Sequence, residues 1–268
     1  MTEGLIINPS EMDRLARLNW ITEKILQNGS VTVEELCDQL EVSRMTIHRD
    51  LDELEEQGVL RKVRGGATAQ RSSLYESSSR YRMRVANLEK EAIARKAVIH
   101  IEPGQAVLLD DSTTTVILSR HIVNIAPLTI ITNCLQILYE MSGKEGIRLI
   151  SLGGEYVPHY DVFAGLLCER SIESIRANIL FMSTSAINES FAFHQDQNVV
   201  KTKRSMMASA TRKILMVDHT KVRQVALHKL ALLNEFSLVI TDEKVDMSFV
   251  RDLQNSGVQV EIAPIESP

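Results

Sequence analysis

Cysteine is scarce in this 268-residue chain, which contains only Cys37, Cys134 and Cys168. Their wide spacing fits neither a disulfide framework nor a metal-ligand motif, so we expect reduced thiols, no metal and no cofactor. The chain also lacks a signal peptide and any run of about 18 apolar residues. These absences argue against secretion and membrane insertion, and they predict a cytoplasmic protein.

Positive charge is scarce as well, because the formal net charge is -5. Residues 1–70 hold eight basic and thirteen acidic side chains. Any affinity for nucleic acid must therefore come from a local basic patch, a specific site and the geometry of an oligomer. No sequence repeat indicates a solenoid, and no heptad seam is visible, so a homo-oligomer could be a dimer or a tetramer.

Residues 29–67 carry the most informative pattern of the chain. Thr32 precedes a segment with Leu36 and Leu40 on one face, and Glu35 completes a capping box. This spacing predicts a short helix that ends near residues 41–42. Ser43 is then expected to cap a second helix after a tight turn.

The second helix has an apolar face and a polar face. Ile47, Leu51 and Leu54 recur at helical spacing and are expected to pack inward. The polar side chains of the first turns then face outward, where a recognition helix meets base edges and phosphates. They are Ser43, Arg44, Thr46, His48 and Arg49. We expect this helix to end at residues 57–58, with a left-handed cap at Gly58.

A basic hairpin is predicted after this helix. Val59 and Leu60 begin a strand, and Gly65–Gly66 forms a turn before a returning strand. Four Lys or Arg and no acid lie between Val59 and Arg71. The candidate DNA-contacting residues of this hairpin are Arg61, Lys62, Arg64 and Gly65. The segment predicts a winged helix-turn-helix that binds double-stranded operator DNA, and the alternative is a helical hairpin used for protein–protein contact.

From about residue 87, short apolar strands alternate with helical segments. A helix is expected over 87–100, and strands are expected at 106–109, 128–132, 147–152, 179–182, 214–217, 238–241 and 258–262. This alternation predicts a doubly wound, mostly parallel α/β domain. We expect a DNA-binding domain at 11–68 after a disordered N-terminus, a linker rich in Ser and Arg at 69–86, and the α/β domain at 87–265.

Polar residues follow five of these strands, at the edge where a parallel sheet binds ligands. Hydroxyls and main-chain N–H groups at a helix N-terminus favour phosphate, and carboxylates accept hydrogen bonds from sugar hydroxyls. The candidate effector-binding residues are Asp110, Ser112, Thr113, Thr114, Thr115, Thr132, Asn133, Gly153, Gly154, Asp218 and Lys221. Each loop alone is more simply explained as the cap of a following helix, but their coincidence at one edge favours a ligand.

These motifs resemble those of DeoR-type bacterial transcriptional regulators. The N-terminal resemblance is carried by VSRMTIHRDL at 42–51, LEEQG at 54–58 and RGGA at 64–67. His48 departs from the usual Arg and replaces a fixed charge with a titratable ring. The strand-end residues match the family pattern of the second domain, in which a shifted Lys203 before Met206–Met207 joins the candidate effector ligands.

The resemblance implies a second domain similar to ribose-phosphate isomerases and glucosamine-phosphate deaminases. It also implies a repressor of a carbohydrate-catabolism operon that a phosphorylated sugar or related metabolite releases from its operator. Family glycines are replaced at Ser112, Ser183 and Ala186. We therefore expect an effector site of changed shape, or one that accommodates phosphate less well.

The alternative is an isomerase-like or deaminase-like enzyme with an appended winged-helix interaction module. Such chemistry needs a general base close to the substrate. Candidates are Asp110, Asp111, His159, His194 and Asp218, but no local constellation singles one out. A free-standing enzyme also has no need of the winged helix, so we expect no catalytic residues.

Overall fold

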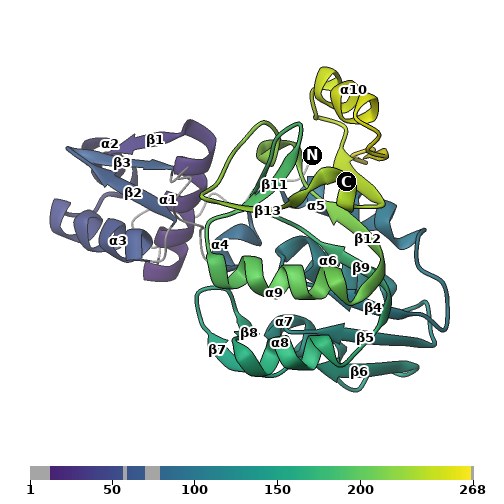
Figure 1. Ribbon diagram of the computed structural model, residues 1–268. Coiled ribbons are helices and arrows are strands. Elements are labelled where there is room, and N and C mark those ends of the chain that lie inside the picture. The colour runs from purple at the N-terminus through teal and green to yellow at the C-terminus, as the bar shows by residue number, and fades with distance from the viewer. Residues whose placement is uncertain (1–12, 57–58, 70–78, 267–268) are drawn as a thin grey trace. The chain divides into compact units, whose positions relative to one another are not determined.

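The computed structural model describes residues 13–56, 59–69 and 79–266. The chain divides into two compact units, Met1–Tyr81 and Arg82–Pro268 (Figure 1). The disorder predicted before Glu11 and the helix end predicted at residues 57–58 lie outside the described residues. No described helix is long and apolar enough to cross a membrane.

The first unit combines a helical cluster with a small antiparallel sheet. Its elements are α1 (Arg14–Asn28), β1 (Ser30–Thr32), α2 (Val33–Leu40), α3 (Arg44–Glu56), β2 (Leu60–Val63) and β3 (Gly66–Ala69), and the short α4 (Ser79–Arg82) spans the boundary between the units. The sheet order is β1-β3-β2. The predicted helix pair and hairpin are present, whereas α1 and the third strand β1 were not predicted.

Local capping chemistry begins both helices of the predicted pair. The Thr32 N–H donates to the Glu35 carboxylate at 2.9 Å, and the Glu35 N–H donates to the Thr32 hydroxyl at 3.2 Å, so the capping box is confirmed. The Ser43 hydroxyl accepts from the Thr46 N–H at 3.2 Å and caps α3. The predicted inward residues of both helices are buried in one core together with residues of α1.

A buried ion pair fastens α3 to α1. Asp50 is only 1% exposed, and one of its oxygens lies 2.6 Å from Nε of Arg17. The hydrogen bond to Asp50 raises the pKa of Arg17 above its usual range. Asp50, the acid of the segment HRDL at 48–51, therefore has a partner within its own unit, while the preceding residues His48 and Arg49 are exposed.

A parallel sheet forms the centre of the second unit, in the order β15-β14-β12-β9-β4-β5-β6. Its strands are β4 (Ala106–Leu109), β5 (Leu128–Thr132), β6 (Ile147–Ser151), β9 (Ala177–Met182), β12 (Ala210–Met216), β14 (Leu238–Asp242) and β15 (Val260–Ala263). All seven predicted strands are present. The chain proceeds from β4 to β5 and β6 on one side and then returns to β9 on the other. The topological switch point therefore lies between β4 and β9.

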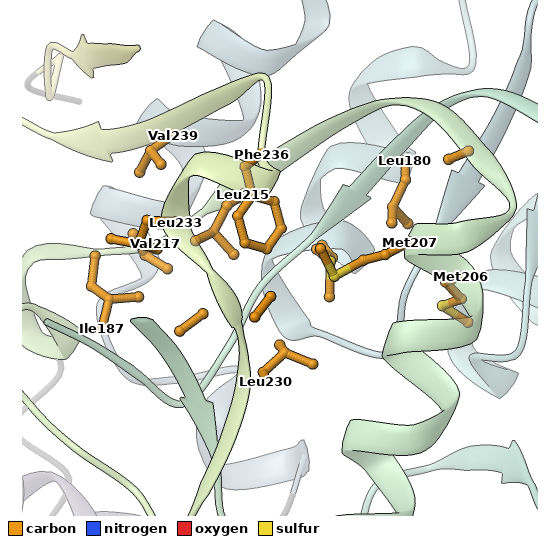
Figure 2. Close-up of a cluster of buried hydrophobic side chains, with 14 of the residues drawn as sticks. Leu180, Ile187, Met206, Met207, Leu215, Val217, Leu230, Leu233, Phe236 and Val239 are labelled. Carbon is orange, nitrogen blue, oxygen red and sulfur yellow. The ribbon is translucent and has the colours of Figure 1, made fainter. Parts of the chain in front are cut away.

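Both faces of this sheet are covered. One face packs against α5 (Asn87–Val98), α6 (Thr113–Ile122) and α7 (Leu135–Met141). The other packs against α8 (Leu166–Glu173), α9 (Gln197–Ala208) and α10 (Met247–Asn255). Adjacent strand residues alternate between these cores, as Leu108 and Leu109 do. Figure 2 shows part of the second core, where Leu215, Phe236 and Met207 point toward one another.

Short antiparallel strands interrupt the predicted alternation. They are β7 (Glu155–Val157) with β8 (Val162–Ala164), and β10 (Ala186–Ile187) with β11 (Phe191–His194) and β13 (His228–Leu232). The 3-10 turns η2 (His219–Lys221) and η3 (Leu233–Glu235) flank β13. The prediction of a helix after every strand-end loop is therefore wrong after β6 and β9, whereas after β12 Asp218 caps the short 3-10 turn η2. β7 and β8 pair with each other, as do β10 and β11, and β11 also pairs with the distant β13.

Asp50→Ala is expected to destabilise the first unit by on the order of 3 kcal/mol, because it leaves the largely buried Arg17 without its carboxylate. Trp20, the only tryptophan, packs against the core of this unit and reports its urea unfolding by fluorescence. Asp52→Ala is the matched control. Asp52 pairs with Lys62 at an exposed position of the same helix, where an ion pair contributes about 0–1 kcal/mol. Equal losses in the two variants would refute the structural role of Asp50.

Candidate functional site

The outward face of α3 contains exposed polar side chains of two kinds. His48 and Arg49 are exposed, and Arg49 makes no ion pair with any described residue. Arg44 is also exposed but reaches Glu34 of α2 at 2.5 Å. Thr46 is half-buried, and its hydroxyl lies 3.0 Å from that of Ser43. Of the predicted recognition residues, His48 and Arg49 are thus the most available to a ligand.

The hairpin of β2 and β3 has basic residues near its tip, and the tip is hydrogen-bonded to the start of α2. Arg61 and Arg64 are exposed without an ion pair to any described residue, whereas Lys62 is half-buried and pairs with Asp52 of α3. Gly65 at the tip has a φ of 82°, a conformation that glycine adopts without strain. Its carbonyl accepts from the Val33 N–H at 2.9 Å and so connects the tip to the start of α2.

In the second unit, the predicted polar loops follow β4, β5, β6, β9 and β12. These strands are contiguous in the sheet, in the order β12-β9-β4-β5-β6. The loops therefore meet at one edge of the sheet, on both sides of the switch point. We name the charged and hydroxyl residues Lys90, Asp110, Asp111, Ser183, Lys203, Asp218 and Lys221 the strand-end cluster.

Asp110 is the hub of the strand-end cluster and has no exposed surface. One of its oxygens accepts from the Ser112 N–H and the Thr115 hydroxyl, each at 3.0 Å. The other accepts from the Ser183 N–H at 2.9 Å and from the Lys203 ammonium. The carboxylate therefore joins β4, β9, α6 and α9 across the switch point.

Lys203 lies on the buried side of α9 and is only 3% exposed. Its ammonium contacts Asp110 and lies 2.7 Å from an oxygen of Asp111. Burial alone would lower the pKa of Lys203, but the two carboxylates outweigh it and raise this pKa above its usual range. Burial opposes ionisation of Asp111 too, yet Lys203 and Arg82 hold the pKa of that carboxyl below its usual range. Both groups are therefore charged at neutral pH.

Lys221 and Asp218 approach the cluster from the loop after β12. The Lys221 ammonium donates to the Ser183 hydroxyl at 3.2 Å and lies 3.9 Å from the Asp218 carboxylate. Burial opposes ionisation of Asp218, but Lys221, Thr220 and Lys90 together lower its pKa. Lys221 keeps 19% of its side-chain surface exposed, so it is more accessible than Lys203.

Lys90 of α5 is a buried cation that the sequence did not single out. It is 2% exposed, donates to the Arg82 carbonyl and forms no ion pair with a described residue. Burial and the charge of Lys221 lower its pKa to about 7, although Asp218 opposes this shift. Lys90 lies one and two helical turns before the buried residues Ile93, Ala94 and Ala97. A lysine on an apolar helical stripe is therefore the pattern by which the sequence could have identified it.

The N-terminus of α6 was predicted to hold phosphate, and its residues are buried. The Ser112 hydroxyl caps the helix by accepting from the Thr115 N–H at 3.2 Å, and the Thr115 hydroxyl is engaged by Asp110. The hydroxyls of Thr113 and Thr114 have no partner among the described residues. Their N–H groups lie in the first helical turn and have no intrahelical acceptor, so they remain available to an anion.

The remaining predicted residues divide into structural and unexplained ones. The Thr132 hydroxyl accepts from the Cys134 N–H at 3.1 Å, which accounts for this side chain. A Cβ at Gly154 would lie 2.3 Å from the Ala164 carbonyl oxygen, so β8 requires this glycine, whereas Gly153 has open space. Asn133 donates to the Phe163 carbonyl, but its buried Oδ1 has no partner among the described residues.

The replaced family glycines fit the backbone without strain. Ser112 has a φ of -80° and acts as a helix cap, so no left-handed conformation is needed there. Ser183 places its hydroxyl against Lys221 and its N–H against Asp110. Ala186 is buried in β10, where it pairs with Phe193. Ser112 and Ser183 thus add hydroxyl contacts at the strand ends, and Ala186 adds a buried methyl group.

The arrangement offers groups that can bind an anion and hydroxyl groups, and two of its carboxylates are already engaged. Asp110 and Asp111 both pair with Lys203, and Lys203 helps to hold the pKa of Asp111 below its usual range, which makes that carboxylate a weak base. His194 is buried and accepts from the Asp196 N–H at 3.1 Å through Nδ1. No group of His, Cys, Asp and Glu among the described residues could hold a metal ion.

Lys90→Met is expected to stabilise the protein near neutral pH, because it removes a buried charge without a paired carboxylate. Between pH 7 and the ordinary lysine value of 10.5, the unfolded chain binds more protons than the folded chain at Lys90. The wild type therefore gains stability relative to the variant as pH rises, by up to about 1.4 kcal/mol per pH unit. Urea unfolding at pH 6, 7, 8 and 9 measures the difference between the two proteins.

Lys96→Met, on the same helix but partly exposed, is the matched control for the replacement of a lysine by methionine. A difference between Lys90→Met and the wild type that stays constant with pH would contradict the lowered pKa of Lys90.

Comparisons with known proteins cover almost the whole chain. Residues 17–73 match the DeoR-like helix-turn-helix domain, and residues 86–243 match the DeoR C terminal sensor domain. The chain is 32% identical to the HTH-type transcriptional regulator GolR of Listeria innocua, over 92% of this chain and 98% of that protein. It is also 32% identical to the HTH-type transcriptional repressor GlcR of Bacillus subtilis, over 91% of this chain and 94% of that protein.

A third relative is the lactose phosphotransferase system repressor of Staphylococcus aureus, with 32% identity over 88% of this chain and 96% of that protein. Matches of this identity and coverage, together with the two family domains in the expected order, decide between the regulator and the enzyme predicted from the sequence. The chain is a DNA-binding transcriptional regulator of the DeoR family.

Proposed function

We propose that the protein represses a carbohydrate-catabolism operon and that a phosphorylated sugar or related metabolite releases it from the operator. The observation that carries the effector part is the pairing state of the strand-end cluster. Lys203 is neutralised by two carboxylates, but Lys90 forms no ion pair with a described residue. The Lys221 ammonium lies 3.9 Å from the Asp218 carboxylate, which is a long distance for an ion pair. A phosphate would supply the missing negative charge beside the free N–H groups of α6.

The sugar part of the effector is supported by unused hydrogen-bonding groups at the same sheet edge. The buried Oδ1 of Asn133 lacks a donor among the described residues, and a sugar hydroxyl would provide one. The hydroxyls of Thr113 and Thr114 and the open space at Gly153 lie at neighbouring strand ends. The proposed effector residues are those predicted from the sequence, with Lys90 and Ser183 added.

On the DNA side, we propose that α3 enters the major groove and that the β2–β3 hairpin rests on the neighbouring backbone. The proposed contacts are Ser43, Arg44, Thr46, His48, Arg49, Arg61, Lys62, Arg64 and Gly65. Arg44 and Lys62 must exchange their present carboxylate partners for phosphates. Exposed ion pairs are weak enough to permit this exchange.

We further propose a homo-oligomer, either a dimer or a tetramer, that acts in the cytoplasm. The DNA-binding domain would span 11–68, the linker 69–86 and the effector domain 87–265. Two recognition helices spaced by about 34 Å, or a multiple of it, would meet a palindromic or repeated operator. The effector shifts the equilibrium between DNA-bound and released protein only if it binds the released state more tightly.

Arg64→Ala is expected to make the slope of log affinity against log salt concentration less steep by about one, because one phosphate contact is lost. The probe is the duplex that the wild-type protein enriches from a random library, titrated by fluorescence anisotropy at several salt concentrations. Arg251→Ala, at an exposed arginine of α10, should leave the slope unchanged. The docking proposal fails if Arg49→Ala and Arg64→Ala both leave affinity and slope at wild-type values.

A panel of pentose and hexose phosphates with their unphosphorylated parents tests the effector by thermal unfolding. A phosphorylated sugar at 100 times its dissociation constant should add about 2.7 kcal/mol of stability if it binds only the folded state. Its parent sugar should add much less. Lys221→Ala should abolish the effect, while Lys201→Ala, at an exposed position of α9, should retain it. Equal stabilisation by sugar and sugar phosphate would overturn the proposed phosphate site.

A further inference from the structure

Met45 is a large apolar side chain held in solvent on the recognition helix. It is 72% exposed, compared with 43% for Val63, the other exposed large hydrophobic residue of the first unit among the described residues. It is the second residue of α3 and lies between Arg44 and Thr46. Met45 therefore does not contribute to the hydrophobic core of its own unit.

Helix geometry directs Met45 away from the core. Ile47, Leu51 and Leu54 form the buried side of α3, and a side chain two residues before Ile47 is rotated by about 200° from it. Met45 therefore lies nearly opposite the core. Arg49 follows four residues later on the same stripe, and both side chains project farthest from the unit.

The neighbours of Met45 in the first turn are engaged elsewhere. Arg44 is drawn toward α2 by its contact with Glu34 at 2.5 Å. The Thr46 hydroxyl lies 3.0 Å from the Ser43 hydroxyl, which also caps the helix. Met45 is thus the first-turn side chain that projects freely, at the end of a recognition helix that contacts base edges.

The chemistry of methionine restricts what it can contact in a major groove. A thioether carries no charge and is only a weak acceptor, so it does not neutralise a phosphate or read a base by hydrogen bonds. The apolar group that a base pair offers in the major groove is the 5-methyl group of thymine. A flexible methionine chain adapts to such a small apolar surface.

We infer that Met45 contacts the 5-methyl group of a thymine and thereby makes one T·A pair of each half-site part of the recognised sequence. The inference rests on the proposed function, because it requires α3 to enter the major groove. It adds a sequence-reading contact that the polar residues of the helix do not provide.

The test replaces single thymines of the enriched duplex by deoxyuridine, which keeps base pairing and removes only the methyl group. At one thymine of each half-site, this change should weaken wild-type binding about fourfold, as expected for one buried methyl group. Met45→Ala should bind the thymine and uracil duplexes equally. Anisotropy titrations at one fixed salt concentration provide the dissociation constants.

Met247→Ala is the matched control, because it makes the same change at a 48% exposed methionine of α10. This variant should distinguish thymine from uracil as the wild type does. Thermal unfolding should show both variants folded, since both side chains are exposed. The inference is overturned if no single uracil weakens the wild type, or if uracil weakens Met45→Ala as much as the wild type.

The failure of this inference differs from a failure of the proposed function. If the wild type enriches no sequence from the random library, sequence-specific DNA binding itself is refuted, and the Met45 contact with it. If a sequence is enriched but its thymine methyl groups have no effect, only the Met45 contact is refuted.

Discussion

The ion pair between Asp110 and Lys203 is the interaction on which the second unit depends. The carboxylate has no exposed surface, and the ammonium is 3% exposed. A buried charge without its partner costs several kcal/mol, so replacing either residue alone would destabilise the folded state. Asp110 follows β4 and Lys203 lies in α9, about 90 residues apart in the chain, and Ser183, which follows β9, donates to the same carboxylate. The same hydrogen bonds therefore join β4 and β9 to α9 and assemble the strand-end cluster.

The strand-end cluster contains lysines in two different states. Lys203 is neutralised by Asp110 and Asp111, whereas Lys90 forms no ion pair with a described residue, and burial lowers its pKa to about 7. Burial therefore disfavours the charged form of Lys90. An anionic ligand would relieve that cost, so a part of its binding energy comes from the protein rather than from new contacts. The proposed effector site and the contacts that join β4, β9 and α9 therefore share the same residues.

The sequence predicted the elements that local chemistry determines. Apolar runs located all seven parallel strands, and capping residues located α2 and α3, because both signals lie within a few residues. The strands β10, β11 and β13 were missed since they are short, and β11 pairs with β13 across about 40 residues. The strand-end loops could be assigned to one sheet edge, but Lys90 could not be assigned to it. Asp218 and Lys221, whose charges affect the pKa of Lys90, lie about 130 residues farther along the chain, and only the fold brings them near it.

The charge distribution along α3 limits how this helix can lie on DNA. Its outward stripe begins with Met45 and Arg49 and continues with the exposed acids Asp52 and Glu56. Phosphates would repel the acidic half, so only the N-terminal half can lie deep in a groove. Arg44 and Lys62 are partly neutralised by acids of their own unit, which confines the free positive charge to Arg49 and the hairpin tip. With so few phosphate contacts, one unit gains little non-specific affinity, so base contacts become the larger part of what it can contribute.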